Sequence, residues 1–244
     1  MKISKKQILF KTVLPGLMQQ HPYVSFDRIK EATQGAKLID SIPTLKDYLS
    51  EAVDKGILHD AGKGWYSSLS EHVQLDPEAH TTLIETVEKA FPLLDFSVWS
   101  TTQFNPWLHH LLAQPVHFLN APADALETIG DTLRDEGWEV TVDPTDRAAR
   151  KAIRPGERMV VLRPTLSRQP APKGRQAGIE QMCVDLLVEN KRCGLMDDEE
   201  AKAAIQRIMR ENLLQVAGMQ RYADSRKLDY FEPSINRLSS PEAH

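Results

Sequence analysis

The segment that starts at Ser41 constrains the fold most, because a capped amphipathic helix leads directly into a tight glycine turn. Ser41 offers an N-cap side chain, and Pro43 lies in the first helical turn, where its missing N–H does no harm. One apolar stripe, which includes Leu45 and Leu49, then continues down to Gly56. Residues 57–67 follow as two short β-prone stretches around a glycine-containing turn, and this pattern predicts a β-hairpin.

Two more helical patterns precede this segment. Apolar residues recur at three- and four-residue spacing over residues 5–20, where Pro15 is expected to kink or interrupt the helix. Ser25 can cap a second, short helix that ends at Gly35. Three helices followed by a hairpin predict a winged helix-turn-helix domain over residues 1–70, whose third helix would lie in the major groove of duplex DNA.

The exposed face of the third helix and the hairpin turn supply the candidate DNA contacts. Thr44 and Ser50 offer hydroxyl groups for base edges or phosphates, and Lys46 and Lys63 offer positive charge for phosphates. Asp47 is a candidate acceptor for a cytosine amino group. Because this helix is not strongly basic, a protein-interaction module is the alternative use of such a domain.

Charge is unevenly distributed along the chain. Residues 1–70 hold ten basic and seven acidic side chains, a net charge of +3, whereas the rest of the chain has a net charge of −7. A mildly positive N-terminal domain on an acidic body fits DNA binding, because phosphate neutralisation supplies most non-specific affinity.

The remainder of the chain alternates helical and extended patterns. Residues 68–80 are polar and indicate a domain boundary. Helices are predicted at 83–91, 106–112, 124–136 and 146–153, and strands at 96–99, 116–119, 138–142 and 158–162. A proline-rich linker at 167–175 precedes three more predicted helices, at 178–190, 197–212 and 213–222. We therefore expect a mixed α+β chain: the winged helix, an α/β domain over 78–230 with helical C-terminal end, and a tail over 231–244.

Catalytic signatures are absent from the sequence. It contains no phosphate-binding glycine loop and no glycine–serine pair followed by the two carboxylates of a nucleotidyltransferase. Asp95 and Glu139 resemble the acidic pair of endonuclease-like folds, but position 141 holds Thr where a lysine is expected. We expect no catalytic residues, no cofactor and no enzymatic activity, with an endonuclease-like protein as the less favoured alternative.

Metal and membrane sites are not expected either. His109, His110 and His117 lack a carboxylate at ligand spacing, and Cys183 and Cys193 are too few for a disulfide framework. The acidic run 197–200 fits the first turn of a helix, where its charge is favourable. No apolar run is long enough to cross a bilayer, so we expect a cytoplasmic protein with free thiols and no membrane partner.

A basic stretch in the body has no assigned role. The side chains of Arg147, Arg150, Lys151 and Arg154 fall at i, i+3, i+4 and i+7, which places them on one helical face. This face is a candidate site for nucleic acid or for an acidic protein surface. The alternative is a solvated face that is balanced by acids from elsewhere in the fold.

The order of these segments resembles the AbiEi family of type IV antitoxins. The resemblance rests on Ser41-Ile-Pro-Thr-Leu-Lys-Asp-Tyr-Leu with Gly56-Ile-Leu, Gly62-Lys-Gly-Trp-Tyr, Asp95-Phe-Ser-Val-Trp-Ser, Val184-Asp-Leu-Leu-Val and Gln220-Arg-Tyr-Ala. It implies that the winged helix represses its own operon at inverted repeats, through Thr44, Lys46, Ser50 and Lys63. It also implies that the rest of the chain opposes a nucleotidyltransferase toxin.

The sequence thus predicts a DNA-binding autorepressor and antitoxin, a monomer or weak dimer, with its own promoter and a cognate toxin as partners. The main alternative is a stand-alone winged-helix regulator whose body senses a ligand or dimerises.

Overall fold

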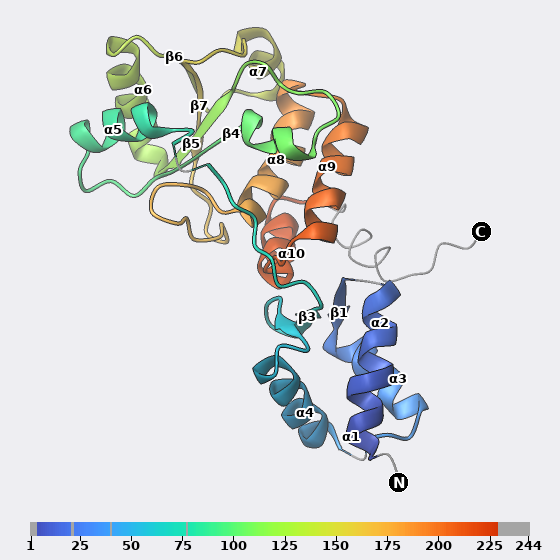
Figure 1. The fold of residues 1–244 in the computed structure, drawn as a ribbon. Helices are drawn as coiled ribbons and strands as arrows, with labels where there is room; N and C mark the ends of the chain where they lie inside the picture. The colour runs from blue at the N-terminus through green and yellow to red at the C-terminus, as the bar shows by residue number, and fades with distance from the viewer. Residues whose placement is uncertain (1–3, 21, 40, 77, 229–244) are drawn as a thin grey trace. The chain divides into compact units, whose positions relative to one another are not determined.

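The computed structural model describes residues 4–20, 22–39, 41–76 and 78–228, without the side chains of residues 20, 147 and 149. Helices and two small β-sheets make up a mixed α/β fold, as expected (Figure 1). The chain divides into two compact units, Gln74–Ile208 and a unit that combines Met1–Val73 with Met209–His244. No helix in the described ranges has the length and apolar character needed to span a bilayer.

The first unit begins with a helical segment that stays continuous past its proline. Helix α1 (Lys5–Ile8) passes through a π-helical turn, η1 (Leu9–Val13), into α2 (Leu14–Gln20). Pro15 lacks an N–H, and its ring crowds the carbonyl group four residues earlier. The π turn lies directly before Pro15, where the wider turn accommodates this crowding. The predicted interruption therefore takes the form of a local change of helix type.

Serine caps set the starts of the next two helices, as predicted. In α3 (Phe26–Gly35) the Ser25 hydroxyl accepts from the Arg28 N–H at 3.3 Å, and in α4 (Ile42–Asp54) the Ser41 hydroxyl accepts from the Thr44 N–H at 3.3 Å. The apolar stripe of α4 packs into a core formed by Leu9, Leu14, Val24, Ile29, Leu45, Leu49, Ala52 and Leu58. Gly56 follows α4 with a φ of 65°.

The predicted hairpin forms, and it pairs with a strand that sequence analysis missed. Strands β2 (His59–Asp60) and β3 (Trp65–Ser67) are antiparallel, and β1 (Tyr23–Ser25) joins β3 on its other side, in the order β1-β3-β2. The three residues of β1 are too short to show a strand pattern, and its last residue also serves as the cap of α3.

The C-terminal helix α10 (Val216–Ser225) belongs to this unit. Buried Tyr23 anchors the chain before it: the Tyr23 hydroxyl accepts from the Leu214 N–H at 3.0 Å and donates to the carbonyl of Asn212. The sequence-based division instead kept residues 78–230 together. Sequence patterns carry no signal for such long-range docking, and the tail at 231–244 lies outside the described residues.

The second unit contains a four-stranded sheet in the order β4-β5-β7-β6. Its strands are β4 (Ser97–Ser100), β5 (His117–Ala121), β6 (Glu139–Val142) and β7 (Met159–Pro164). Strand β4 is antiparallel to β5, whereas β5 and β6 both run parallel to β7. The parallel strands are linked through η3 (Ala123–Ala125), α6 (Leu126–Asp135) and α7 (Asp146–Ala152), in agreement with the predicted α/β layer.

Helices cover both faces of this sheet. Apolar side chains of α5 (Thr81–Ala90) and α6 share a core with Val98, Leu119 and Leu162. Helix α8 (Ile179–Cys193) contacts Asn120 and Arg163, which alternate with those apolar residues and therefore point to the opposite face. The remaining helix of this region, α9, spans Asp198–Glu211.

One predicted helix is wrong. Residues 106–112 do not form an α-helix; a 3₁₀ helix, η2 (Thr101–Trp107), ends where the prediction begins. Pro106 lies inside that 3₁₀ segment, and the Asn105 side chain holds the following loop closed. Its amide donates to the Leu112 carbonyl at 3.0 Å, and its oxygen accepts from the Leu112 N–H at 2.8 Å. These side-chain bonds replace a helical turn.

Candidate nucleic-acid interface

A groove of about 910 Å³ lies in the first unit between the starts of α3 and α4 and the β2–β3 hairpin. We call it the hairpin groove, and its lining includes Ser25, Ile42, Lys46, Lys63, Trp65 and Gln220. The capped starts of both helices place Ser25 and Ile42 at its edge. The groove is therefore assembled from elements that local sequence signals set in position.

Two of the residues predicted to contact DNA meet in this groove. Lys46 comes from the exposed face of α4 and Lys63 from the hairpin turn, and both side chains are exposed. Within the described ranges, neither lysine has a carboxylate at ion-pair distance. Both ammonium groups are thus available to an anion in the groove.

The other three predicted contacts are not part of the groove lining. Asp47 and Ser50 are exposed on α4 outside it. Thr44 is half-buried, and its hydroxyl lies 2.8 Å from the hydroxyl of Ser41, within the helix cap. Thr44 therefore has a structural role at the start of α4.

Sequence analysis missed several lining residues. Ile42 is apolar and begins α4, yet 44% of its surface is exposed, and it lines the groove. Trp65 was treated only as a strand residue. Gln220 is far away in the sequence on α10, and no local pattern links it to the hairpin.

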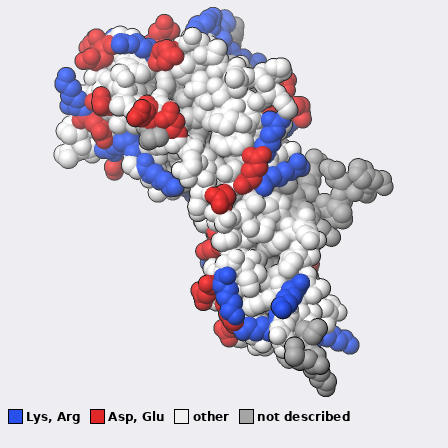
Figure 2. Space-filling model, in the orientation of Figure 1, with Lys and Arg blue, Asp and Glu red and all other residues white. Residues whose placement is uncertain are grey.

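Neighbouring lysines of the same unit are neutralised. Glu51 on α4 forms ion pairs with Lys55, at 2.7 Å, and with Lys6. Hydrogen bonds from these two ammonium groups, that of Lys55 first, lower the pKa of the Glu51 carboxyl. Figure 2 shows the result on one face of the molecule, where acidic and basic side chains are interspersed. Lys6 and Lys55 are therefore less available to an anion than Lys46 and Lys63 of the groove.

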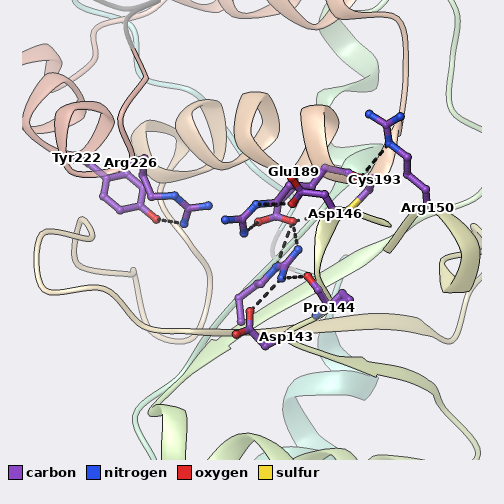
Figure 3. A network of polar contacts seen from close by, with 10 residues as sticks. Asp143, Pro144, Asp146, Arg150, Glu189, Cys193, Tyr222 and Arg226 are labelled. Carbon is purple, nitrogen blue, oxygen red and sulfur yellow. Dashed lines mark hydrogen bonds and ion pairs between the residues drawn. The ribbon is translucent and has the colours of Figure 1, made fainter. Parts of the chain in front are cut away.

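One residue of the basic face predicted in the second unit, Arg150, binds another element of that unit. The Arg150 guanidinium donates to the carbonyls of Arg192, at 3.3 Å, and Lys191, at 3.0 Å, at the C-terminal end of α8 (Figure 3). Helix α7 ends before Arg154, whose guanidinium donates to the carbonyl of Ile153. Lys151 is exposed, and the Arg147 side chain lies outside the described part of the structure.

A buried ion pair connects the sheet to α8 in this unit. The Arg163 guanidinium donates to the Glu189 carboxylate at 2.6 and 3.1 Å, and to Asp143 at 3.0 Å and the Pro144 carbonyl at 2.8 Å (Figure 3). Burial is the largest single influence and lowers the pKa of Arg163, but the charge of Glu189 and the hydrogen bonds to Glu189 and Asp143 together more than offset it, and the pKa is raised. The basic residues of this part of the chain therefore differ in location: Arg163 is in the core and Lys151 is on the surface.

A comparison with known protein families found one family whose model matches most of the chain. A family of unknown function, DUF6577, matches residues 44–236. The chain belongs to this family. The match includes Lys46, Lys63 and Gln220 of the hairpin groove, together with the whole second unit. A comparison with curated proteins gave no match.

In this DUF6577 protein the two acids considered for a nuclease lie on opposite edges of the sheet. Asp95 lies two residues before the start of β4, and Glu139 begins β6. The order β4-β5-β7-β6 puts three strand spacings, about 14 Å, between those edges. This fold does not bring the two carboxylates to one metal ion.

His117 and the two cysteines are buried, whereas His109 and His110 are exposed. The rings of His80 and His117 approach to 3.3 Å, and burial lowers the pKa of His117 to about 4. Both cysteines are buried, and burial raises the pKa of Cys193 to about 12. Among the described residues, no three His, Cys, Asp or Glu side chains are grouped so that they could hold a metal ion.

A second cavity, of about 300 Å³, lies beside the segment 165–175 in the same unit. Its lining includes Asp95, Gln169 and Arg175, and the Gln169 amide donates to the buried Ser97 hydroxyl at 3.2 Å. The predicted proline-rich linker is thus packed against β4.

Proposed function

We propose that this DUF6577 protein is a DNA-binding transcriptional regulator whose first unit is a winged helix. Helix α4 would enter the major groove, and the β2–β3 hairpin would act as the wing beside it. The observation that carries the proposal is that Lys46 of α4 and Lys63 of the hairpin turn line one groove and that neither forms an ion pair within the described residues, although Asp27 lines the groove as well.

The order of elements in this unit supports the proposal. A helical segment, strand β1, helices α3 and α4, and strands β2 and β3 follow one another as in winged helices. The pairing of β1 with β3 holds the hairpin against the start of α3. A fixed hairpin beside an exposed helix fits two neighbouring contacts on one duplex.

The two lysines would neutralise phosphates of the DNA strand that passes between α4 and the wing. Ser50 and Asp47, exposed on α4, would face base edges, where Asp47 can accept from a cytosine amino group. Thr44, through its cap, would position the start of α4.

The resemblance to AbiEi antitoxins extends this proposal to a target and a partner. The promoter of the protein's own operon, with inverted repeats, would be the DNA site, and the second unit would oppose a nucleotidyltransferase toxin. Co-expression with a neighbouring nucleotidyltransferase gene tests the second part: growth should be restored by the full chain and not by a chain without residues 74–208. Loss of growth with both would refute the antitoxin role.

DNA binding is tested by titrating the full chain against its labelled promoter fragment and against a scrambled duplex at several salt concentrations. Lys46→Ala with Lys63→Ala should weaken binding to both duplexes and make the plot of log K against log salt shallower by about two. The matched control is Lys89→Ala with Lys191→Ala, which removes the same charge from the second unit.

Equal weakening in both double variants would show that only overall charge matters, and would contradict a role for the groove. A wild-type protein that binds neither duplex would refute DNA binding altogether. Binding to both duplexes with equal affinity would leave a DNA-binding protein but refute a promoter-specific repressor.

A further inference from the structure

The side chain of Gln220 enters the hairpin groove from α10. It lines the same cavity as Lys46 and Lys63 and is half-buried there. In the described part of the chain, its amide has no hydrogen-bond partner, in contrast to that of Gln215, the residue before α10. Neither polar atom of this side chain is both buried and unpartnered, so the amide is open to solvent in the free protein and can donate to an incoming ligand.

Helix α10 is fixed against the hairpin by close backbone contacts. The Ala217 N–H donates to the Ala61 carbonyl at 3.3 Å, and the Gln215 amide donates to the Asp60 carbonyl at 3.2 Å. Gly62 has a φ of 99°, and a Cβ there would lie 2.8 Å from the Cβ of Ala217. The close approach requires glycine at this position, so the hairpin turn and α10 hold a fixed spacing.

The inward face of α10 is buried as well. Val216, Met219, Tyr222 and Ala223 are fully buried, which sets the rotation of the helix about its axis. Gln220 therefore projects from a helix whose position and rotation are both determined. Such pre-ordering lowers the entropy that a contact loses when a ligand binds.

The geometry points to Gln220 as a third DNA contact, whose amide donates to a phosphate oxygen of the strand held by Lys46 and Lys63. The inference rests on the proposed function and names a contact from the opposite end of the chain. Neutral amides commonly make such backbone contacts. Because Gln220 carries no charge, its contact should release no counterion.

This difference gives the test. In the same titrations with full-length protein, Gln220→Ala should raise Kd about three- to tenfold on promoter and scrambled duplex alike, as expected for one neutral hydrogen bond. The slope of log K against log salt should equal that of the wild type. Gln220→Glu, of nearly the same size, should weaken binding further because its carboxylate repels phosphate.

Gln34→Ala is the matched control, since Gln34 is exposed at the C-terminal end of α3, in the same unit but outside the groove lining. It should bind as the wild type does. Thermal unfolding of each variant should match that of the wild type.

A Gln220→Ala variant that binds as tightly as the wild type, while the lysine variants weaken, overturns the inference and leaves the proposed function standing. A shallower salt slope in Gln220→Ala also overturns it, because Gln220 would then act by positioning Lys63. If the wild type itself binds no duplex, the proposed function fails and this inference fails with it.

Discussion

Replacing Arg163 by methionine should destabilise the second unit through the carboxylate that remains. Arg163 and Glu189 are 4% and 2% exposed, and their contacts at 2.6 and 3.1 Å are accompanied by bonds to Asp143 and Pro144. Methionine keeps much of the aliphatic volume but removes the guanidinium. The Glu189 carboxylate would then stay buried without its main cation.

The expected loss follows from this environment. Removing one partner of a buried ion pair costs about 3–5 kcal/mol, because the other charge remains desolvated. The guanidinium of Arg192, at 3.3 Å from the second oxygen of Glu189, would still offer partial compensation. We therefore expect a loss of about 3 kcal/mol, at the lower end of that range.

Urea unfolding followed by tryptophan fluorescence measures this loss. Of the four tryptophans, Trp99, Trp107 and Trp138 lie in the second unit and Trp65 in the first, so the signal reports mainly on the unit that changes. Arg134→Met is the control, since it breaks an exposed ion pair with Asp131 and should cost less than about 1 kcal/mol.

The double variant Arg163→Met with Glu189→Leu separates the two possible causes. With both charges gone, no uncompensated ion is buried, so stability should return to within about 1–2 kcal/mol of the wild type. A double variant less stable than Arg163→Met alone would refute the reasoning, because packing rather than charge would then dominate. A loss in Arg163→Met no larger than in the Arg134→Met control would refute it too.

Three further predictions concern other contacts. Tyr23→Phe should lower the free energy of unfolding of the first unit by about 1–3 kcal/mol, because the Leu214 N–H loses its acceptor. Proteolysis after residue 209 should be faster in this variant, and an unchanged rate of proteolysis would contradict the prediction. The pKa of His117 is lowered from 6.5 to about 4, so this side chain stays neutral in the folded protein over a pH range in which the unfolded chain binds a proton. The free energy of unfolding should therefore fall by up to about 3 kcal/mol as pH drops from 6.5 to 4. In urea titrations, His117→Gln should lose most of this pH dependence. Gly130→Ala should lower the melting temperature, because the added Cβ would lie 2.9 Å from the Val142 side chain. Gly35→Ala is the control and should not lower it, because a Cβ there would meet no atom within 4 Å. Equal shifts in both variants would contradict the packing argument.

Local chemistry made much of this fold predictable. Ser25 and Ser41 act as helix caps in the structure, and the glycine-containing turn forms the expected hairpin. Both signals depend on interactions within a few residues, so the amino-acid order alone specifies them. The four strands of the α/β layer could be predicted for the same reason, because each is a short apolar pattern between helices.

Side-chain partners could not be predicted in this way. Arg150 and Arg163 are both arginines of the second unit, yet one binds the carbonyls at the end of α8 and the other is buried against Glu189. Sequence spacing gives the direction of a side chain on its own element. Which element packs against that side chain is decided only when segments far apart in the sequence meet in the fold.

The sequence by itself determined the helices apart from the one expected at 106–112, the hairpin, and the positions of Lys46 and Lys63. Only the tertiary structure decided that both lysines line one groove and that α10 closes it with Gln220. The physical reason is that backbone hydrogen bonds and caps act over a few residues. The docking of α10 depends instead on a missing Cβ at Gly62 and on a buried Tyr23 hydroxyl, contacts that join residues far apart in the chain.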